Sequence, residues 1–192
     1  MAILNTALAI TKMEKNYFSE LSVHSIRCAK LIRQLALETG YDDNITHLVS
    51  GALIHDIGKL YIPIEILGAP RKLTDREFSF IQKHVVYGER LANSLDVFPQ
   101  TAIDMVLYHH EKLDGSGYLH KTGEDLSREV QMMTVVDIFE SLTANRCYHI
   151  ARSKEEALDN LYQLARQGKI NLYYVKALEK VISKPQKRKK AA

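Results

Sequence analysis

The hydrophobic positions of this sequence follow a helical period along most of the chain. Apolar residues recur three and four positions apart, which is the spacing that places side chains on one face of an α-helix. No stretch alternates apolar and polar residues over a length that would form a useful strand. The pattern therefore predicts an all-α fold with short connections, a bundle of about seven to nine helices.

Local residue chemistry predicts where these helices begin and end. A short helix is expected from Leu4 to about Asn16, and a longer one from about Phe18 to Thr39, where Gly40 can end it. Capping boxes, in which a Thr or Ser and a Glu satisfy free amide groups, predict helix starts at residues 74 and 153. The helix that starts at 74 should end near 95, and the helix that starts at 153 should end at 167. The other helices are expected over residues 43–56, 99–110, 127–145 and 171–183.

The length of 192 residues fits one domain of ordinary size. We expect a lead-in over residues 1–17, the domain over 18–183 and a basic, disordered tail over 184–192. Prolines and glycines predict loops over 58–73 and 111–126. The apolar fraction of 46% and the charged fraction of 26% are typical of a soluble globular protein.

The cysteine content and the N-terminus indicate a cytoplasmic protein. The two cysteines, Cys28 and Cys147, are far apart and suggest neither a disulfide framework nor a thiolate zinc site. The chain has no secretory signal and no apolar run of the ~18 residues that a membrane span needs.

The net charge of +3 comes from the C-terminal tail, because the rest of the chain is slightly acidic. A basic surface that could bind DNA or RNA is therefore not expected on the folded part.

Candidate chemistry comes from histidines and aspartates on the predicted helices. An isolated pair such as His55-Asp56 is most often a solvated helix end, and a lone histidine is most often an ordinary core or surface residue. Asp137, however, lies within an apolar helix, and burying a carboxylate without a partner costs several kcal/mol, so it should pair with a cation or metal. Five of the eight histidines lie on or at the ends of predicted helices: His24, His55, His84, His109 and His110.

Taken together, these residues resemble the HD phosphohydrolase superfamily, and most closely its HD-GYP branch. The resemblance covers roughly residues 18–165, and each of its segments alone would be weak. Five such segments in the order found in the family are together a specific signature of it. The segments are His24–Arg27, His55–Lys59, Gln82–His84 with Gly88, His109–Tyr118, and Asp137 with Leu142–Tyr148.

The resemblance implies a helical bundle with a metal cluster at its centre. A glutamate one turn before the first histidine binds a third metal in some members, and Glu20 has that position; the alternative is a surface carboxylate. By resemblance, one metal is held by His24, His55, Asp56 and Asp137, and a second, bridged by Asp56, by His84, His109 and His110.

Mixed imidazole and carboxylate ligands suit divalent transition-metal ions. We expect two or three such ions, with iron or manganese as the first candidates and nickel or zinc as the next. Two such ions lower the pKa of a shared water and neutralise a phosphodiester, so no serine or cysteine nucleophile is needed. Asp56 would be catalytic as the bridge. Lys59, one turn beyond it, would bind the phosphate or assist the leaving oxygen; without the family context it would be a solvated lysine.

The family implies hydrolysis of cyclic di-GMP or a related cyclic dinucleotide to a linear dinucleotide or GMP. Arg146 matches a substrate-binding position of the family, and Tyr148 lies in the same segment. The sequence departs from the family pattern at two places, and both make the substrate contacts less certain than the metal binding. Leu119, followed by His120, replaces the proline that ends the family signature, and His149 replaces a basic residue.

Two other functions stay open at this stage. The chain could be a non-catalytic module that binds metal or nucleotide and signals through a partner, which the altered signature favours. It could also be an HD phosphohydrolase acting on other nucleotides. The expected partners are a cyclic dinucleotide substrate and either a second copy of the chain, through the helices after Asn145, or a signalling protein.

Overall fold

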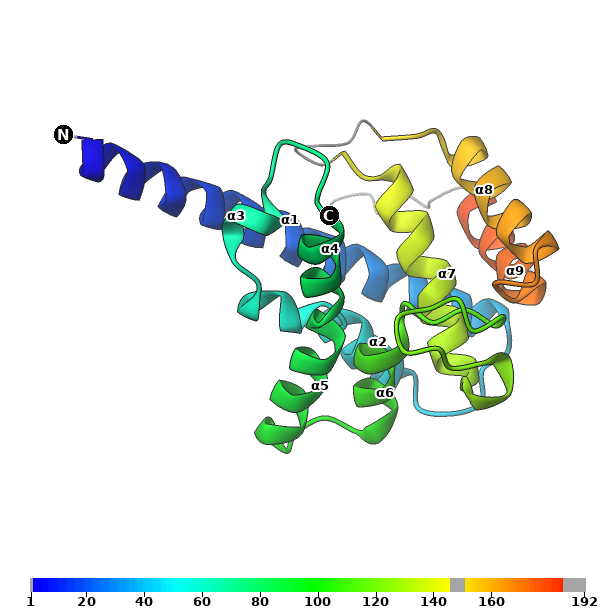
Figure 1. Cartoon of the computed structure of the whole chain (residues 1–192). Helices are drawn as coiled ribbons and strands as arrows, with labels where there is room; N and C mark the ends of the chain where they lie inside the picture. Colours follow the sequence, from blue (N-terminus) through cyan, green and yellow to red (C-terminus); the bar gives the residue numbers. More distant parts are fainter. Residues whose placement is uncertain (1, 146–150, 185–192) are drawn as a thin grey trace, which may run out of the picture.

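The computed structural model describes residues 2–145 and 151–184, with side chains from Lys15 onward. Its regular elements in these ranges are all helical, and the β pairing there is limited to one isolated bridge between Asp114 and Thr122. The expected all-α fold is confirmed. The elements are α1 Ala2–Glu38, α2 Ile45–Ile54, η1 Ile57–Tyr61, α3 Ile64–Leu67, α4 Asp75–Gln82, α5 His84–Leu95, α6 Gln100–Tyr108, η2 Gly123–Asp125, α7 Arg128–Thr143, α8 Lys154–Arg166 and α9 Leu172–Ser183 (Figure 1).

The long helix α1 organises the bundle. Its first turns extend away from the body of the molecule, whereas its later turns pack against α2, α7 and α9 (Figure 1). On one side α2 packs on α6, and α6 on α5; on the other, α8 and α9 pack on α7. The fully buried side chains that join these helices include Ile32, Leu35, Leu48, Met133 and Leu161.

The expectation of two helices before residue 40 was wrong, because α1 is continuous from Ala2 to Glu38. Residues 2–38 contain neither glycine nor proline, so no residue at the expected boundary interrupts the helical hydrogen bonds. Gly40 follows the helix with a φ of 66°, as expected of a glycine that ends one. The division of the chain into a lead-in and a domain at residue 18 stays a prediction.

The single helix expected over residues 74–95 is also corrected. It is divided at Lys83 into α4 and α5. The Lys83 amide donates to the carbonyl of Phe80, a tight turn that redirects the chain just before His84. The break orients His84 toward the interior, where it is fully buried.

The two expected capping boxes are confirmed, whereas α2 is capped by Asn44 and not by the Asp42 or Asp43 that we expected. Both capping boxes form, between Thr74 and Glu77 and between Ser153 and Glu156. Ser127 accepts a hydrogen bond from the amide of Val130 at the start of α7. These polar contacts fix the entry points of α4, α7 and α8.

Gly58 brings η1 and α5 into direct backbone contact. A Cβ atom built on Gly58 would lie 1.8 Å from the carbonyl oxygen of His84 and 2.5 Å from the amide nitrogen of Gly88. Only glycine allows this approach. It holds His55 and Asp56, which directly precede η1, against His84 at the start of α5.

None of the helices in the described ranges combines the length and apolar character needed to span a membrane. Of the tail expected to be disordered over 184–192, Lys184 is described and pairs with Glu38, and residues 185–192 lie outside the described residues.

Candidate metal centre

Histidines and aspartates from five parts of the chain converge in the middle of the bundle. They come from α1, the turn between α2 and η1, the start of α5, the end of α6 and the middle of α7. Their side chains are almost completely removed from solvent, with His110 alone partly exposed. The seven expected main ligands are all among them: His24, His55, Asp56, His84, His109, His110 and Asp137.

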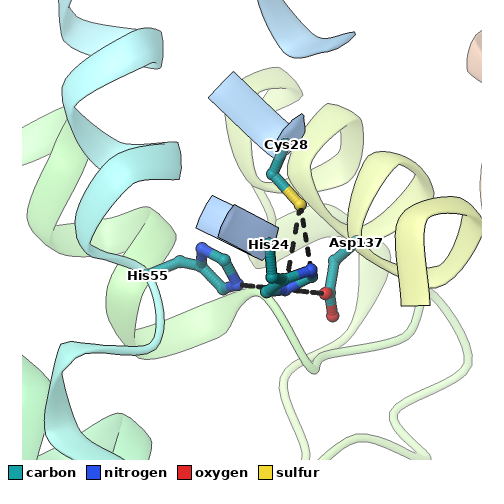
Figure 2. Close-up of side chains that lie close together, drawn as sticks. All are labelled: His24, Cys28, His55 and Asp137. Atoms are coloured by element: carbon teal, nitrogen blue, oxygen red, sulfur yellow. Dashed lines mark hydrogen bonds and ion pairs between the residues drawn. The ribbon is translucent and has the colours of Figure 1, made fainter. Parts of the chain in front are cut away.

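The ligand atoms form two groups, and within each group all of them lie within 4.8 Å of one another. The first group contains three expected ligands and Cys28, which the sequence analysis had not assigned to a metal (Figure 2). The second contains Asp56 with the three histidines expected around it. The groups are His24, Cys28, His55 and Asp137, and Asp56, His84, His109 and His110.

The carboxylate of Asp56 lies between the two groups. Its Oδ2 is 3.5 Å from His55 Nε2 and 3.8 Å from His24 Nε2, whereas its Oδ1 is 3.2 Å from His84 Nε2 and 3.7 Å from His109 Nε2. Each oxygen therefore faces a different group, which is the arrangement expected of a bridging ligand.

The residues fit a bound cation. Asp56 Oδ1 is buried and has no hydrogen-bond partner among the described residues. Such a buried oxygen is costly unless something positive binds it, so a cation between it and the facing imidazoles would remove the cost.

Backbone hydrogen bonds orient three of the imidazoles. In each, Nδ1 lies beside a carbonyl oxygen, which can only accept, so Nδ1 carries the proton and Nε2 keeps the lone pair that binds metal. These pairs are His55 with Ala52 at 2.8 Å, His84 with Ile81 at 2.8 Å, and His109 with Val106 at 3.0 Å.

A carboxylate orients His24 in the same way. The Glu140 side chain, on α7 one turn after Asp137, is buried and binds His24 Nδ1. Nε2 then points at Asp137 Oδ1, 3.1 Å away. Burial alone would lower the pKa of His24, but hydrogen bonds to Asp137, Cys28 and Glu140 outweigh it and raise this pKa to about 12. The surroundings of His24 thus stabilise positive charge.

Two carboxylates and two imidazoles of the centre have the charge states that metal ligands require. Burial would raise the pKa of Asp56, yet Lys59 and His55 hold it well below its usual range. Asp137 is likewise held low despite burial, mainly by His24. Burial lowers the pKa of His109 to about 4 and that of His110 well below its usual value, so both imidazoles are neutral.

Lys59 contacts the bridge directly. Its Nζ lies 2.6 Å from Asp56 Oδ2, and 15% of its side chain is exposed. Glu20 does not belong to either ligand group. It lines a pocket together with Tyr17, His24 and Lys59, beside the metal centre. Its role as ligand of a third metal stays a prediction.

The loop after α6 is built around Glu111, a buried carboxylate that the sequence analysis missed. Its Oε1 accepts the Leu119 amide at 2.8 Å and its Oε2 the Lys121 amide at 2.7 Å. Proline at residue 119 would lack that amide hydrogen, so Leu119 adds a bond that the family's usual residue cannot make. The loop places the Tyr118 ring 4.4 Å from that of His110.

Three contributors were missed for different reasons. Cys28 and Glu140 stand four and three positions after expected ligands on the same helices, a spacing that could have indicated them. Glu111 carries no comparable signal, because its partners are backbone amides of a loop. The expected substrate residues Arg146 and Tyr148, and the departure at His149, lie outside the described residues.

Replacing Glu140 with glutamine should weaken metal binding. The variant keeps the shape of the side chain but loses the charge that supports His24, and losing such an outer partner typically costs about 10–100-fold in metal affinity. Metal titration of the purified protein measures this effect. Glu129→Gln is the matched control, because Glu129 is also buried on α7 but binds Tyr41 instead. Equal affinities in the two variants would contradict the assigned role.

The chain is similar in sequence to a known protein family and to several characterised proteins. Residues 8–171 match the family described as HD domain. The chain is 32% identical over 158 residues to a cyclic di-GMP phosphodiesterase of Pseudomonas aeruginosa, covering 82% of this chain and 37% of the relative. It is 39% identical over 129 residues to 3'3'-cGAMP-specific phosphodiesterase 3 of Vibrio cholerae, covering 67% of this chain and 27% of the relative. The chain thus spans well under half the length of these relatives.

Solved structures share the fold. An HDG"Y"P protein from Bdellovibrio bacteriovorus superposes with a TM-score of 0.72 at 22% identity, over 85% of this chain and 52% of the other. The HD domain of a Listeria monocytogenes phosphodiesterase in complex with cyclic-di-AMP gives a TM-score of 0.65 at 19% identity, over 84% and 87%.

Proposed function

The chain belongs to the HD-domain family, in its HD-GYP branch, and we propose that it is a metal-dependent phosphodiesterase that hydrolyses a cyclic dinucleotide. Cyclic di-GMP is the first candidate substrate, because the relatives named above act on it or on the related 3'3'-cGAMP. The observation that carries the proposal is the Asp56 carboxylate, buried between two ligand groups with one oxygen unpartnered among the described residues.

Two divalent ions, iron or manganese first, would be held by the two groups. When bound they would activate a water and neutralise the phosphodiester. The imidazoles fixed by backbone carbonyls and the carboxylates held ionised would keep this site ready, so little reorganisation would be needed on binding.

The chain's own residues would bind and orient the substrate. Lys59 lines the same pocket as His24, so its ammonium can meet a phosphate there and stabilise negative charge as the bond breaks. The Glu111 loop holds Tyr118 against His110, at the second ligand group. Arg146 and Tyr148 are proposed as further substrate contacts on the strength of the family resemblance.

Replacing Lys59 with methionine should leave the metal content unchanged and slow hydrolysis. Methionine keeps the length of the side chain and removes the charge near the phosphate, an electrostatic loss of about 100-fold in kcat. Elemental analysis and steady-state kinetics measure the two quantities. Lys83→Met, at an exposed lysine on the nearby break between α4 and α5, is the control. Loss of metal with the activity would instead make Lys59 a residue that only supports Asp56.

A substrate panel tests the proposal against its alternatives. The manganese- or iron-loaded protein would be incubated with cyclic di-GMP, 3'3'-cGAMP, cyclic di-AMP and mononucleotide phosphoesters, with products identified by mass spectrometry. Cleavage of at least one cyclic dinucleotide is expected. Binding by calorimetry without cleavage would favour the non-catalytic module, to which the altered Leu119 position points, and cleavage of mononucleotides alone would favour a different phosphohydrolase.

A further inference from the structure

A pocket opens beside the metal centre, between α1 and the short elements η1, α3 and α4. The helix α3 contacts both α1 and α4 (Figure 1). The cavity has a volume of about 210 Å³. Pockets that take a whole drug-sized ligand have roughly 300–1,000 Å³. This cavity therefore suits one ring system of a ligand better than all of a cyclic dinucleotide.

Most of the pocket lining is apolar. It comes from Tyr17 and Leu21 on α1, Leu67 on α3 and Ile81 on α4, and all four side chains are partly exposed. An apolar wall with a few placed polar groups is typical of ligand sites. The ring of a tyrosine in such a wall offers a face on which a nucleobase can stack.

Two polar members of the lining connect the pocket to the metal centre. His24 belongs to the first ligand group, and Lys59 Nζ is 2.6 Å from Asp56 Oδ2. In a cyclic dinucleotide, a single ribose separates each base from the neighbouring phosphates. A phosphate bound at the metal centre and Lys59 therefore brings one base within reach of the pocket.

The third polar member of the lining is Glu20, which is half-buried one helical turn before His24. A carboxylate only accepts hydrogen bonds. Guanine presents two adjacent donors, N1–H and the 2-amino group, on one edge. Adenine presents an acceptor, N1, beside its amino group. The chemistry of the lining thus fits guanine better than adenine.

We propose that this pocket is the subsite for one guanine base of the substrate, with Tyr17 as its stacking surface and Glu20 as its hydrogen-bond acceptor. The inference rests on the proposed function, since the substrate phosphate must lie at the metal centre. Enzymes that act on an unstacked base read it in this way, by stacking and by hydrogen bonds to its Watson–Crick edge. The subsite would favour cyclic dinucleotides that contain guanine over cyclic di-AMP.

Replacing Tyr17 with leucine tests the stacking surface. Leucine keeps an apolar side chain but removes the ring, so the KM for cyclic di-GMP should rise about 10-fold, with little change in kcat or metal content. The Kd of a non-hydrolysable phosphorothioate analogue, measured by calorimetry, should rise equally. Tyr17→Phe keeps the ring and should retain the affinity of the wild type.

Tyr173→Leu, at an exposed tyrosine on α9, is the matched control for the loss of a ring. It should bind cyclic di-GMP as the wild type does. Unchanged affinity in Tyr17→Leu, or an equal loss in Tyr17→Phe, would overturn the stacking role of Tyr17.

Replacing Glu20 with glutamine tests the choice of base. The glutamine amide turns a donor toward the guanine donors, so kcat/KM for cyclic di-GMP should fall about 10-fold, the usual order for loss of a hydrogen bond to a charged group. The value for cyclic di-AMP should not fall. Glu65→Gln, at an exposed glutamate on α3, is the control. Loss of a metal ion in Glu20→Gln would assign Glu20 to a third ion and overturn its role in the subsite, as would an unchanged preference.

The wild type separates failure of this inference from failure of the proposed function. Turnover of cyclic di-GMP with the same KM in wild type and Tyr17→Leu would overturn the subsite alone. Binding of cyclic di-GMP without turnover would overturn the proposed hydrolysis, and the Kd values would still decide for or against the subsite. Absence of both binding and turnover in the metal-loaded wild type would overturn both.

Discussion

Replacing Asp56 with asparagine should remove most of the bound metal and abolish hydrolysis. Its two carboxylate oxygens face different ligand groups, so one substitution weakens both sites at once. Asparagine keeps the size of the side chain but supplies one neutral oxygen in place of a charge. The loss of activity should exceed the roughly 100-fold that removal of an outer-shell partner costs.

Elemental analysis of protein purified without oxygen, together with turnover of a cyclic dinucleotide, measures the effect of Asp56→Asn. Circular dichroism establishes that the variant folds. Asp159→Asn, at an exposed carboxylate on α8, controls for the change of charge. If Asp56→Asn kept the metal content of the wild type, the bridging role of Asp56 would be wrong.

Replacing Gly58 with alanine should destabilise the protein and separate the two halves of the metal centre. The added methyl group would lie 1.8 Å from the His84 carbonyl and 2.5 Å from the Gly88 amide, so backbone rather than a flexible side chain must move. Overpacking of a core typically costs 1–3 kcal/mol, and we expect this contact to cost more than about 3 kcal/mol. Displacement of α5 would withdraw His84 from Asp56.

Urea unfolding and metal titration measure these two effects of Gly58→Ala. Gly123→Ala is the matched control, because a Cβ there would meet the flexible Leu113 side chain at 3.2 Å and backbone no nearer than the Leu113 carbonyl oxygen at 3.5 Å, an ordinary contact. We expect the control to keep its metal and most of its stability. A Gly58→Ala protein with the stability and metal content of the wild type would contradict the backbone contact between η1 and α5.

The sequence predicted the helices well because each has a local cause. Capping residues such as Thr74 and Ser153, and Gly40, act within one or two turns, so their effects can be read from neighbouring positions. The break at Lys83 could not be predicted in this way. No glycine, proline or capping side chain marks it, and it lies beside the contact of Gly58 with α5, which joins residues far apart in the sequence.

The same distinction applies to the metal centre. The family resemblance identified the seven expected main ligands because their residue types and order are specific, and the structure brings them together. Glu140 and Glu111 were missed because their contacts are with residues brought near by the fold, His24 on α1 for the first and loop amides for the second. Cys28 was missed although it stands one turn after His24 on the same helix. Proposed contacts of Arg146 and Tyr148 with the substrate stay predictions.

Removal and return of the metal, with cyclic di-GMP as substrate, test the central proposal most directly. The chelator-treated protein should not cleave cyclic di-GMP, and added manganese or ferrous iron, under anaerobic conditions, should restore formation of the linear dinucleotide or GMP. Wild type should regain activity while Asp56→Asn should not. Intact cyclic di-GMP after long incubation of the reloaded wild type, or cleavage that persists without metal, would contradict the proposed function.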